Sequence, residues 1–303
     1  MNTSSKRIVT RPDFDGIVCA VLLRDAENID TDIFWVEPND IQADRVDIQS
    51  GDILANLPYS QDCDLWFDHH ISNKPEDDFN GAFEVAPSAA RVIYRHYQDI
   101  GILDDRYDEL IFHTDIIDAA MLNRDQVQYP ENYPYILLSM TIKNQGDGDH
   151  AYWNLLVDLL KETDITDIMA HPDVHERCSE VIRENSHWEK HLKDHTRVEN
   201  KISITDFRSL ETVPTGNRFL SYSIFPESIA SVKIRYGSNR ETVQISIGQS
   251  IFNRQCNVNI GKLLSRYGGG GHAGAGGCTM ALEDADPFIK EILQVMFDNK
   301  PID

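Results

Sequence analysis

The chain has 303 residues, 41% of them hydrophobic, and its formal charge is −22 because 50 acidic residues outweigh 28 basic ones. A chain of this length can form two ordinary domains, each with its own core. The negative field repels polyanions, so we do not expect an extended surface that binds long nucleic acid.

Membrane spans and disulfide bonds are not expected. No apolar run is as long as a membrane span, and residues 1–7 lack the apolar stretch of a signal peptide. The five cysteines are widely spaced and form no Cys-x-x-Cys pair, which is typical of free thiols in a reducing compartment. We therefore expect a soluble, cytoplasmic protein with no membrane partner.

The chain opens with the pattern of a βα unit. A short apolar strand, Ile8-Val9, is followed by the polar segment 11–16 and then by an apolar helix from Ile17 to Leu23. Asp13 and Asp15 stand two residues apart in the connecting loop, where both carboxylates can turn toward one point. Their alternative role is to cap the helix.

Further buried strands are expected at residues 33–36, 52–56 and 65–67, which favours a mostly parallel sheet. Asp68-His69-His70 follows the last of these strands. Ligands of open α/β sheets bind at the carboxyl edge, so the triplet lies where a metal or a proton can be handled. Imidazole and carboxylate together suit Mn or Zn. The alternative is a hydrogen-bonded structural feature.

From residue 87 the pattern becomes helical, and this stretch closes with Asp115 and Asp118, which are candidate ligands or helix caps. Residues 123–149 contain several Pro and Gly residues and are expected to be a loop. The charged segment 174–198 has few apolar positions and is expected to be a long helical connector between domains.

The C-terminal part is predicted to be α+β. Apolar residues alternate on both sides of the turn 237–239, which indicates a hairpin, and helices are expected at 260–267 and 287–298. Between these helices lies the glycine-rich stretch 268–277, whose backbone N–H groups can surround an anion. A plain glycine-rich turn is the alternative.

These three stretches, in this order, resemble the DHH/DHHA1 phosphoesterase superfamily, which includes RecJ-type exonucleases, oligonucleotide and pAp phosphatases and exopolyphosphatase-like proteins. The resemblance implies an α/β DHH phosphoesterase domain, with a mostly parallel sheet and helices, over residues 1–170. It implies a helical connector over 171–200 and a smaller α+β DHHA1 substrate-binding domain over 201–303. The substrate would lie in the cleft between the two domains.

The resemblance also implies roles for single residues. The implied metal ligands are Asp13, Asp15, His69 and either Asp115 or Asp118. Asp68 would contact the ligand His69 on the side away from the metal and fix its tautomer. His70 would contact the phosphate or assist the leaving group. The implied substrate-binding residues are Gly269, Gly270, Gly271 and His272. Arg254 would bind the phosphate through the paired N–H donors of its guanidinium.

Two departures from the family pattern bear on the metal count. Val9 and Arg11 occupy the places where many relatives carry a metal-binding His. Asn56 stands at the strand edge where relatives carry a metal-bridging Asp, and a neutral amide bridges two cations poorly. Asp52, at the opposite end of that strand, is the other candidate. One or two metal ions remain open.

The leading hypothesis is a Mn²⁺-dependent phosphoesterase, with Mg²⁺ or another divalent ion as an alternative. Its substrate would be small and phosphorylated: a short single-stranded oligonucleotide, a nucleotide phosphate or polyphosphate. The second hypothesis is a binding protein for a phosphorylated ligand whose metal centre has degenerated, because of Arg11 and Asn56. The sequence is compatible with a homodimer but does not determine the oligomeric state.

Overall fold

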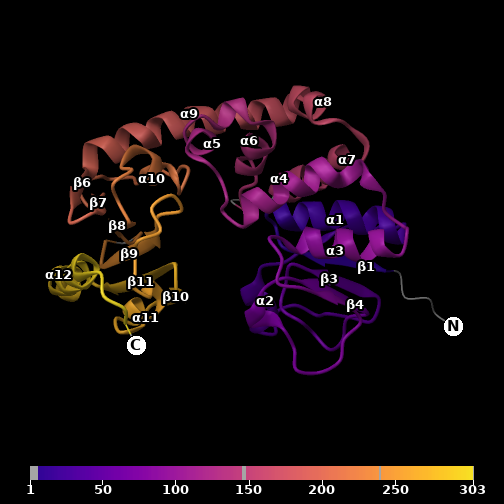
Figure 1. Cartoon of the computed structure of the whole chain (residues 1–303), viewed down its shortest axis with the longest axis horizontal. Coiled ribbons are helices and arrows are strands. Elements are labelled where there is room, and N and C mark those ends of the chain that lie inside the picture. Colours follow the sequence, from indigo (N-terminus) through magenta and orange to yellow (C-terminus); the bar gives the residue numbers. More distant parts are fainter. Residues whose placement is uncertain (1–5, 145–147, 239, 303) are drawn as a thin grey trace. The chain divides into compact units, whose positions relative to one another are not determined.

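The computed structural model describes residues 6–144, 148–238 and 240–302. The chain divides into two compact units, which Figure 1 shows in sequence colours. The first unit comprises Met1–Leu122 and Pro130–Ser179, and the second comprises Asn123–Tyr129 and Glu180–Asp303. The functional division that we predicted, with limits at residues 170 and 200, stays a prediction.

A five-stranded sheet forms the centre of the first unit, in the order β2-β1-β3-β4-β5, and every neighbouring pair is parallel. Its inner strands are short and almost fully buried, as a sheet covered on both faces requires. This confirms the predicted parallel sheet. The strands are β1 Arg7–Thr10, β2 Phe34–Trp35, β3 Asp52–Ala55, β4 Leu65–Asp68 and β5 Gly81–Phe83.

Helix α1 (Phe14–Glu27) is the core helix of this unit. Ten consecutive residues, Phe14 to Leu23, are buried, because the sheet lies on one side of the helix and other helices on the rest. Figure 1 shows α3 and α4 beside it. The other helices are α2 Pro38–Gln42, α3 Ala89–Asp99, α4 Asp108–Asp118, α6 Pro134–Met140, α7 Gly148–Glu162 and α8 Ile165–Ala170, with 3-10 turns at Ile71–Asn73, Asp105–Tyr107 and Pro130–Asn132.

The prediction of a loop over 123–149 is wrong for most of this segment, because helices form there. Helix α5 (Arg124–Gln128) begins with a capping box, in which Asn123 and Gln126 bond each other's backbone N–H groups. Helix α6 begins at Pro134, because proline fits the first turn of a helix, where its missing N–H has no partner to lose. Residues 145–147, including Gly146, lie outside the described residues.

The second unit is built on a six-stranded mixed sheet, in the order β10-β11-β9-β8-β7-β6. Only β7 and β8 pair in parallel among its described strands, and β8 and β9 form the predicted hairpin. This confirms the predicted α+β unit. The strands are β6 Thr196–Glu199, β7 Ile202–Asp206, β8 Ala230–Tyr236, β9 Thr242–Gln249, β10 Gly270–His272 and β11 Ala275–Ala281.

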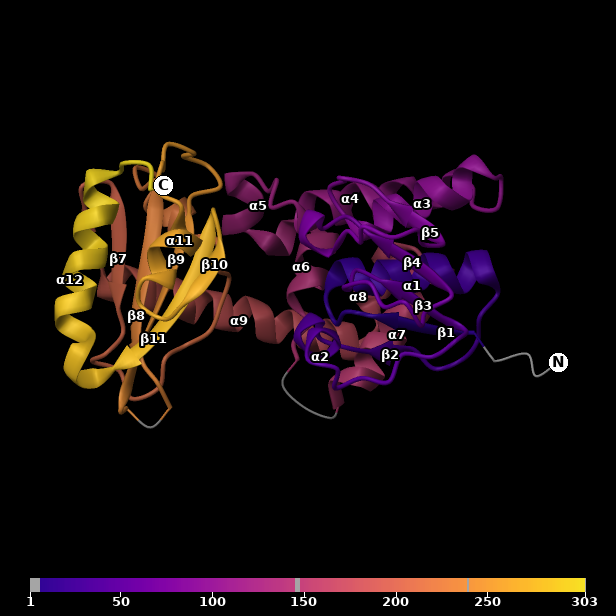
Figure 2. The ribbon, with the colours of Figure 1, turned by 90° about the horizontal axis from the view of Figure 1, so that it is seen from below.

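One face of this sheet carries the core of the second unit. Figure 2 shows α12 along the sheet. Ile292 and Met296 of this helix belong to the same buried core cluster as residues of β8 and β9. The helices are α10 Leu220–Ile224, α11 Ile260–Ser265 and α12 Leu282–Asp298, and α9 Pro172–His195 supplies residues to both units. Pro287, the expected start of the last helix, lies inside it, after two acidic residues in the first turn.

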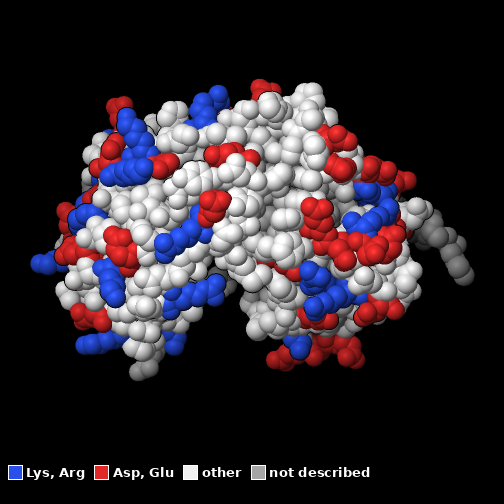
Figure 3. All heavy atoms as spheres, turned by 45° about the horizontal axis from the view of Figure 1, so that its top comes forward, with Lys and Arg blue, Asp and Glu red and all other residues white. Residues whose placement is uncertain are grey.

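The surface reflects the acidic composition. On the face drawn in Figure 3, acidic side chains gather over the part that carries the N-terminus, with several Lys and Arg side chains among them. Among the described helices, none combines the length and the hydropathy needed to cross a bilayer.

Candidate metal centre and active site

The loop between β1 and α1 is held in one conformation by close packing. A Cβ atom at Gly16 would lie 2.0 Å from the carbonyl oxygen of Arg11 and 2.9 Å from Oγ1 of Thr10, so only glycine fits. The Thr10 hydroxyl lies 3.0 Å from the carbonyl of Ala55 at the end of β3 and donates a hydrogen bond to it. The loop and the end of β3 are therefore fixed against each other.

Asp13 caps α1 and is held by other polar groups. Its Oδ1 accepts hydrogen bonds from the Gly16 N–H at 2.9 Å and from Asn56 Nδ2 at 3.0 Å. Its Oδ2 lies 3.2 Å from Nε of Arg11. Both predicted roles of Asp13 were open from the sequence, and the structure places it as the helix cap.

Asp15, His69 and Asp118 come together. Each offers one ligand atom, and these three atoms lie within 4.8 Å of one another. Asp15 is only 2% exposed, and its two oxygens accept hydrogen bonds from the N–H groups of Ala89 and Ala90, each at 2.9 Å, at the start of α3. Three parts of the fold thus converge: the first turn of α1, the residue that follows β4, and α4, whose last residue is Asp118.

The position of the His69 ring determines which nitrogen is free. Nδ1 lies 2.9 Å from the carbonyl oxygen of Ala86. A carbonyl oxygen can only accept a hydrogen bond, so Nδ1 carries the proton and Nε2 presents its lone pair. That Nε2 is buried and has no hydrogen-bond partner; its nearest acidic atom is Oδ2 of Asp118 at 3.4 Å. An unpartnered buried lone pair beside carboxylates fits a metal ligand.

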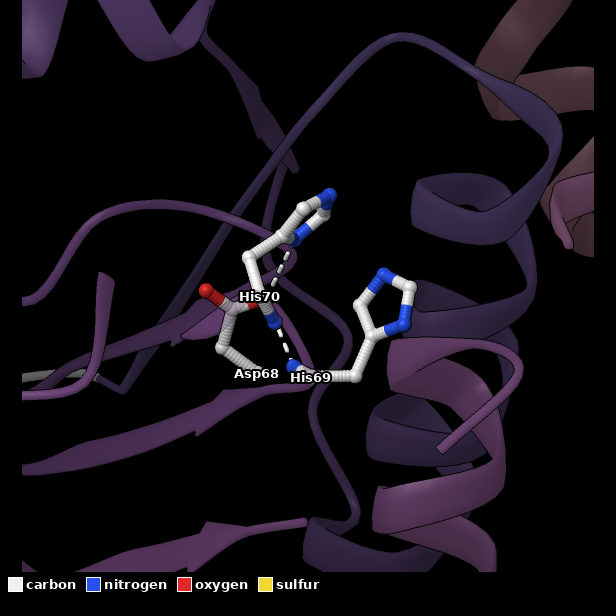
Figure 4. A group of neighbouring side chains, drawn as sticks. All are labelled: Asp68, His69 and His70. Atoms are coloured by element: carbon white, nitrogen blue, oxygen red, sulfur yellow. Dashed lines mark hydrogen bonds and ion pairs between the residues drawn. The ribbon is translucent and has the colours of Figure 1, made fainter. Parts of the chain in front are cut away.

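Asp68 orients His70, not His69. Its Oδ1 accepts hydrogen bonds from the His70 ring Nδ1 at 2.8 Å and from the backbone N–H of His69 (Figure 4), while Oδ2 accepts one from Asn73. The expectation that Asp68 supports the His69 ring is therefore wrong: the Ala86 carbonyl has that place. Asp68 is fully buried, whereas the side chain of His70 is 36% exposed.

The electrostatics of the group favour a cation. Burial, and then repulsion by Asp118 and Asp13, raises the pKa of Asp15 well above its usual value. Burial, and then repulsion by Asp13, raises the pKa of Asp118 to about 6. The hydrogen bond to Asp68 raises the pKa of His70. Carboxylates that resist ionisation together are relieved by a bound divalent ion.

Two other acidic candidates lie elsewhere. Oδ2 of Asp115 is held by Nε and Nη2 of Arg91, at 2.8 and 2.6 Å, and Oδ1 accepts a hydrogen bond from Ser88. Asp52, at the start of β3, pairs with Arg7 at 2.7 Å. Each of these two carboxylates forms an ion pair with an arginine. The structure brings neither of them into the Asp15–His69–Asp118 group.

The predicted substrate-binding residues belong to the second unit. His272 ends β10 and is exposed, and the Nε of exposed Arg254 lies 3.3 Å from the carbonyl oxygen of Ile251 and donates a hydrogen bond to it. A Cβ atom at Gly269 or Gly271 would lie 2.3 Å from a carbonyl oxygen of β11, whereas Gly270 has open space. Close strand packing thus explains two of the glycines, and the substrate-binding role of the stretch stays a prediction.

Two groups that shape the site carry no signal in the sequence. One is the Ala86 carbonyl, a backbone group that any residue supplies. The other is Arg91, which neutralises Asp115; an Arg on a helix is usually a surface residue, and only the contact between α3 and α4 reveals its partner. A third group, Asn73, follows the triplet closely and could have been noticed as a polar support.

The donor set fits a first-row divalent ion. Asp15, His69 and Asp118 supply two carboxylates and one neutral imidazole nitrogen, which suit Mn²⁺ and leave positions for water or substrate. The buried, unpartnered Nε2 of His69 is the observation that a metal would satisfy. The residues of this chain therefore fit the group.

The chain is similar to several solved structures. No protein-family model and no curated protein matches its sequence. It is 34% identical, with a TM-score of 0.87, to a pGpG-specific phosphodiesterase, PggH, from Vibrio cholerae, over 97% of this chain and 99% of that one. The chain belongs to the DHH/DHHA1 phosphoesterase superfamily. It is accordingly a phosphoesterase.

More distant structures share the fold. RecJ from Thermus thermophilus, solved with Mn²⁺, is 14% identical with a TM-score of 0.59, over 98% of this chain and 52% of that one. The DHH domain of a protein assigned to a family of ribosomal proteins is 13% identical with a TM-score of 0.59, over 98% and 87%. These likenesses confirm the predicted architecture of a DHH unit followed by a DHHA1 unit.

Proposed function

We propose that this phosphoesterase uses Mn²⁺ to hydrolyse a short linear oligonucleotide of the pGpG type, cutting its single phosphodiester bond. The observation that carries the proposal is the 34% identity to the pGpG-specific phosphodiesterase across both units of the chain. The net charge of −22 supports a short substrate, because a long polyanion would be repelled by the rest of the surface.

The choice of metal is part of the proposal. RecJ from Thermus thermophilus was solved in complex with Mn²⁺ and, separately, with Mg²⁺. An imidazole nitrogen among the ligands favours Mn²⁺ over Mg²⁺, which prefers oxygen. Asp15, His69 and Asp118 would hold the ion, which supplies a Lewis acid and an activated water when bound.

The protein's own groups then position the substrate and move a proton. His70 keeps its proton on Nδ1 because Asp68 accepts that hydrogen bond, and Asp68 raises the pKa of the ring. The imidazolium Nε2–H of His70 would donate its proton to the leaving oxygen of the scissile ester. The Ala86 carbonyl keeps the proton of His69 on Nδ1, so that Nε2 stays available as a ligand.

The second unit would bind the rest of the substrate. Under this proposal residues 1–170 form the DHH domain, 171–200 the connector and 201–303 the DHHA1 domain, as the sequence predicted. Arg254 and His272 are both exposed, and Gly270 has open space beside it, which suits contact with a phosphate.

The test is product analysis by chromatography. Purified protein with Mn²⁺ is expected to convert pGpG to GMP, faster than it releases products from pAp, polyphosphate or a long single-stranded oligonucleotide, and a chelator should stop the reaction. His69→Ala should abolish it, whereas His175→Ala, which changes an exposed His of the same unit, should not.

Two results would contradict the proposal. Cleavage of long strands in preference to pGpG would place the substrate class elsewhere. Binding of pGpG without any hydrolysis in Mn²⁺ would favour the alternative, a binding protein with a degenerate metal centre.

A further inference from the structure

Both oxygens of Asp13 already have polar partners among the described residues. Its Oδ1 already accepts two hydrogen bonds, from Gly16 and Asn56, and its Oδ2 faces the Arg11 guanidinium at 3.2 Å. The guanidinium beside this carboxylate disfavours a second cation there, because it offsets the negative charge of Asp13 and repels the incoming ion.

Asn56 reinforces this arrangement. It follows β3 and is only 2% exposed, and its Nδ2 is turned toward Asp13 while its Oδ1 is buried without a hydrogen-bond partner. An amide offers no charge to offset a second cation. Its backbone is in the left-handed region, with φ of 57°, which Asn and Asp both tolerate, so an aspartate can replace it without backbone strain.

Arg11 is a fixed cation at the rim of the site. Its side chain is 39% exposed, and its Nε lies 3.2 Å from Oδ2 of Asp13. The guanidinium is close enough to His70 and Asp118 to influence the pKa of each. A second divalent ion beside it would be repelled, whereas a phosphate would be attracted to this partly exposed guanidinium, whose N–H groups can donate to its oxygens.

We propose that this centre holds one divalent ion, at Asp15, His69 and Asp118, and that Arg11 stands in for a second ion by binding the substrate's phosphate. Asp13 and Asn56 then act as positioning residues: Asp13 fixes the Nε side of Arg11, and Asn56 fixes Asp13. This inference rests on the proposed function for its substrate, but its metal count can be tested without any substrate.

The metal count is measured by titrating metal-free protein with Mn²⁺, using calorimetry and the loss of the free Mn²⁺ signal in electron paramagnetic resonance. The wild-type chain is expected to bind one ion. The double variant Arg11→His and Asn56→Asp removes the cation and adds two ligands, and it should bind two. Arg95→His, which changes an exposed arginine of α3 that also pairs with a single carboxylate, is the matched control and should bind one.

The phosphate role is measured with inorganic phosphate as the probe, in saturating Mn²⁺. Arg11→Gln should weaken phosphate binding about 10- to 100-fold, the usual loss for a charge-assisted hydrogen-bonded pair, and leave one bound Mn²⁺. Arg11→Lys should cause a smaller loss of phosphate affinity than Arg11→Gln, because lysine keeps the charge but lacks the paired N–H donors of the guanidinium. Arg95→Gln should bind phosphate as the wild type does.

Several outcomes would overturn the inference. Two Mn²⁺ ions in the wild type, or a single ion in the double variant, would show that Arg11 and Asn56 do not set the metal count. Unchanged phosphate binding in Arg11→Gln would remove its substrate role. Failure to hydrolyse pGpG would contradict the proposed substrate but would leave the measured metal counts valid. Failure of the proposed function and failure of this inference are therefore distinguishable.

Discussion

Replacing Asp118 with asparagine should stabilise the metal-free protein at alkaline pH. Asp118 ends α4 among other acidic groups, and burial and Asp13 raise its pKa from 3.8 to about 6. A raised carboxyl pKa means that the folded state binds the proton more tightly than the unfolded state does. Stability is then greatest below about pH 4 for this group and is lost as the pH rises through about 6.

The size of the effect follows from the pKa difference. The shift from 3.8 to about 6 corresponds to about 3 kcal/mol of unfolding free energy at pH 8, at about 1.4 kcal/mol per pKa unit. Asparagine cannot ionise, so Asp118→Asn should recover most of this penalty. For a unit of this size, the midpoint of thermal unfolding should rise by roughly 6 to 12 °C.

The assay is thermal unfolding of chelator-treated protein, followed by circular dichroism between pH 4 and pH 8. The gain should be absent at pH 4 and full at pH 8, and saturating Mn²⁺ should reverse the order, because only the wild type keeps all three ligands. Asp77→Asn, an exposed loop residue of the same unit, is the control and should show neither effect. A variant that is less stable than the wild type at pH 8 without metal would refute the reasoning.

Two further substitutions probe neighbouring groups. Asp68→Asn should lower the pKa of His70, so the alkaline limb of the pH–rate profile should move to lower pH while Mn²⁺ binding is kept; an unmoved limb would exclude His70 as the proton donor. Arg91→Ala should leave the carboxylate of Asp115 uncompensated and cost about 3 kcal/mol in denaturant unfolding. Arg95→Ala, which breaks an exposed pair, should cost less than about 1 kcal/mol, and equal losses would contradict the argument.

Much of the fold could be predicted because hydrophobic patterns repeat in it. The buried strands β3 and β4 are short apolar runs, and apolar and polar residues alternate in β8 and β9 on both sides of their turn. Each of these strands can therefore be recognised from its own residues. The helices α5 and α6 could not be predicted in this way, because they are short and begin at Asn123 and Pro134, which also mark loops.

The sequence named the three residues that the structure brings together, but among other candidates and without their hydrogen-bond partners. The order of the motifs predicted Asp15 and His69, yet Asp115 and Asp118 were equivalent on the sequence. Only the contact between α3 and α4 distinguishes them, because it brings Arg91 to Asp115, where the two side chains form an ion pair. Likewise, the family resemblance implied that Asp68 supports His69, whereas the turn after β4 brings Asp68 to the ring of His70.

The most direct measurement for the central claim is a crystal structure of the protein grown with Mn²⁺, with the ion located by its anomalous scattering. The account predicts an anomalous peak within bonding distance of Nε2 of His69 and of carboxylate oxygens of Asp15 and Asp118. A peak bonded to His70, or Mn²⁺ bound only at other residues, would contradict it.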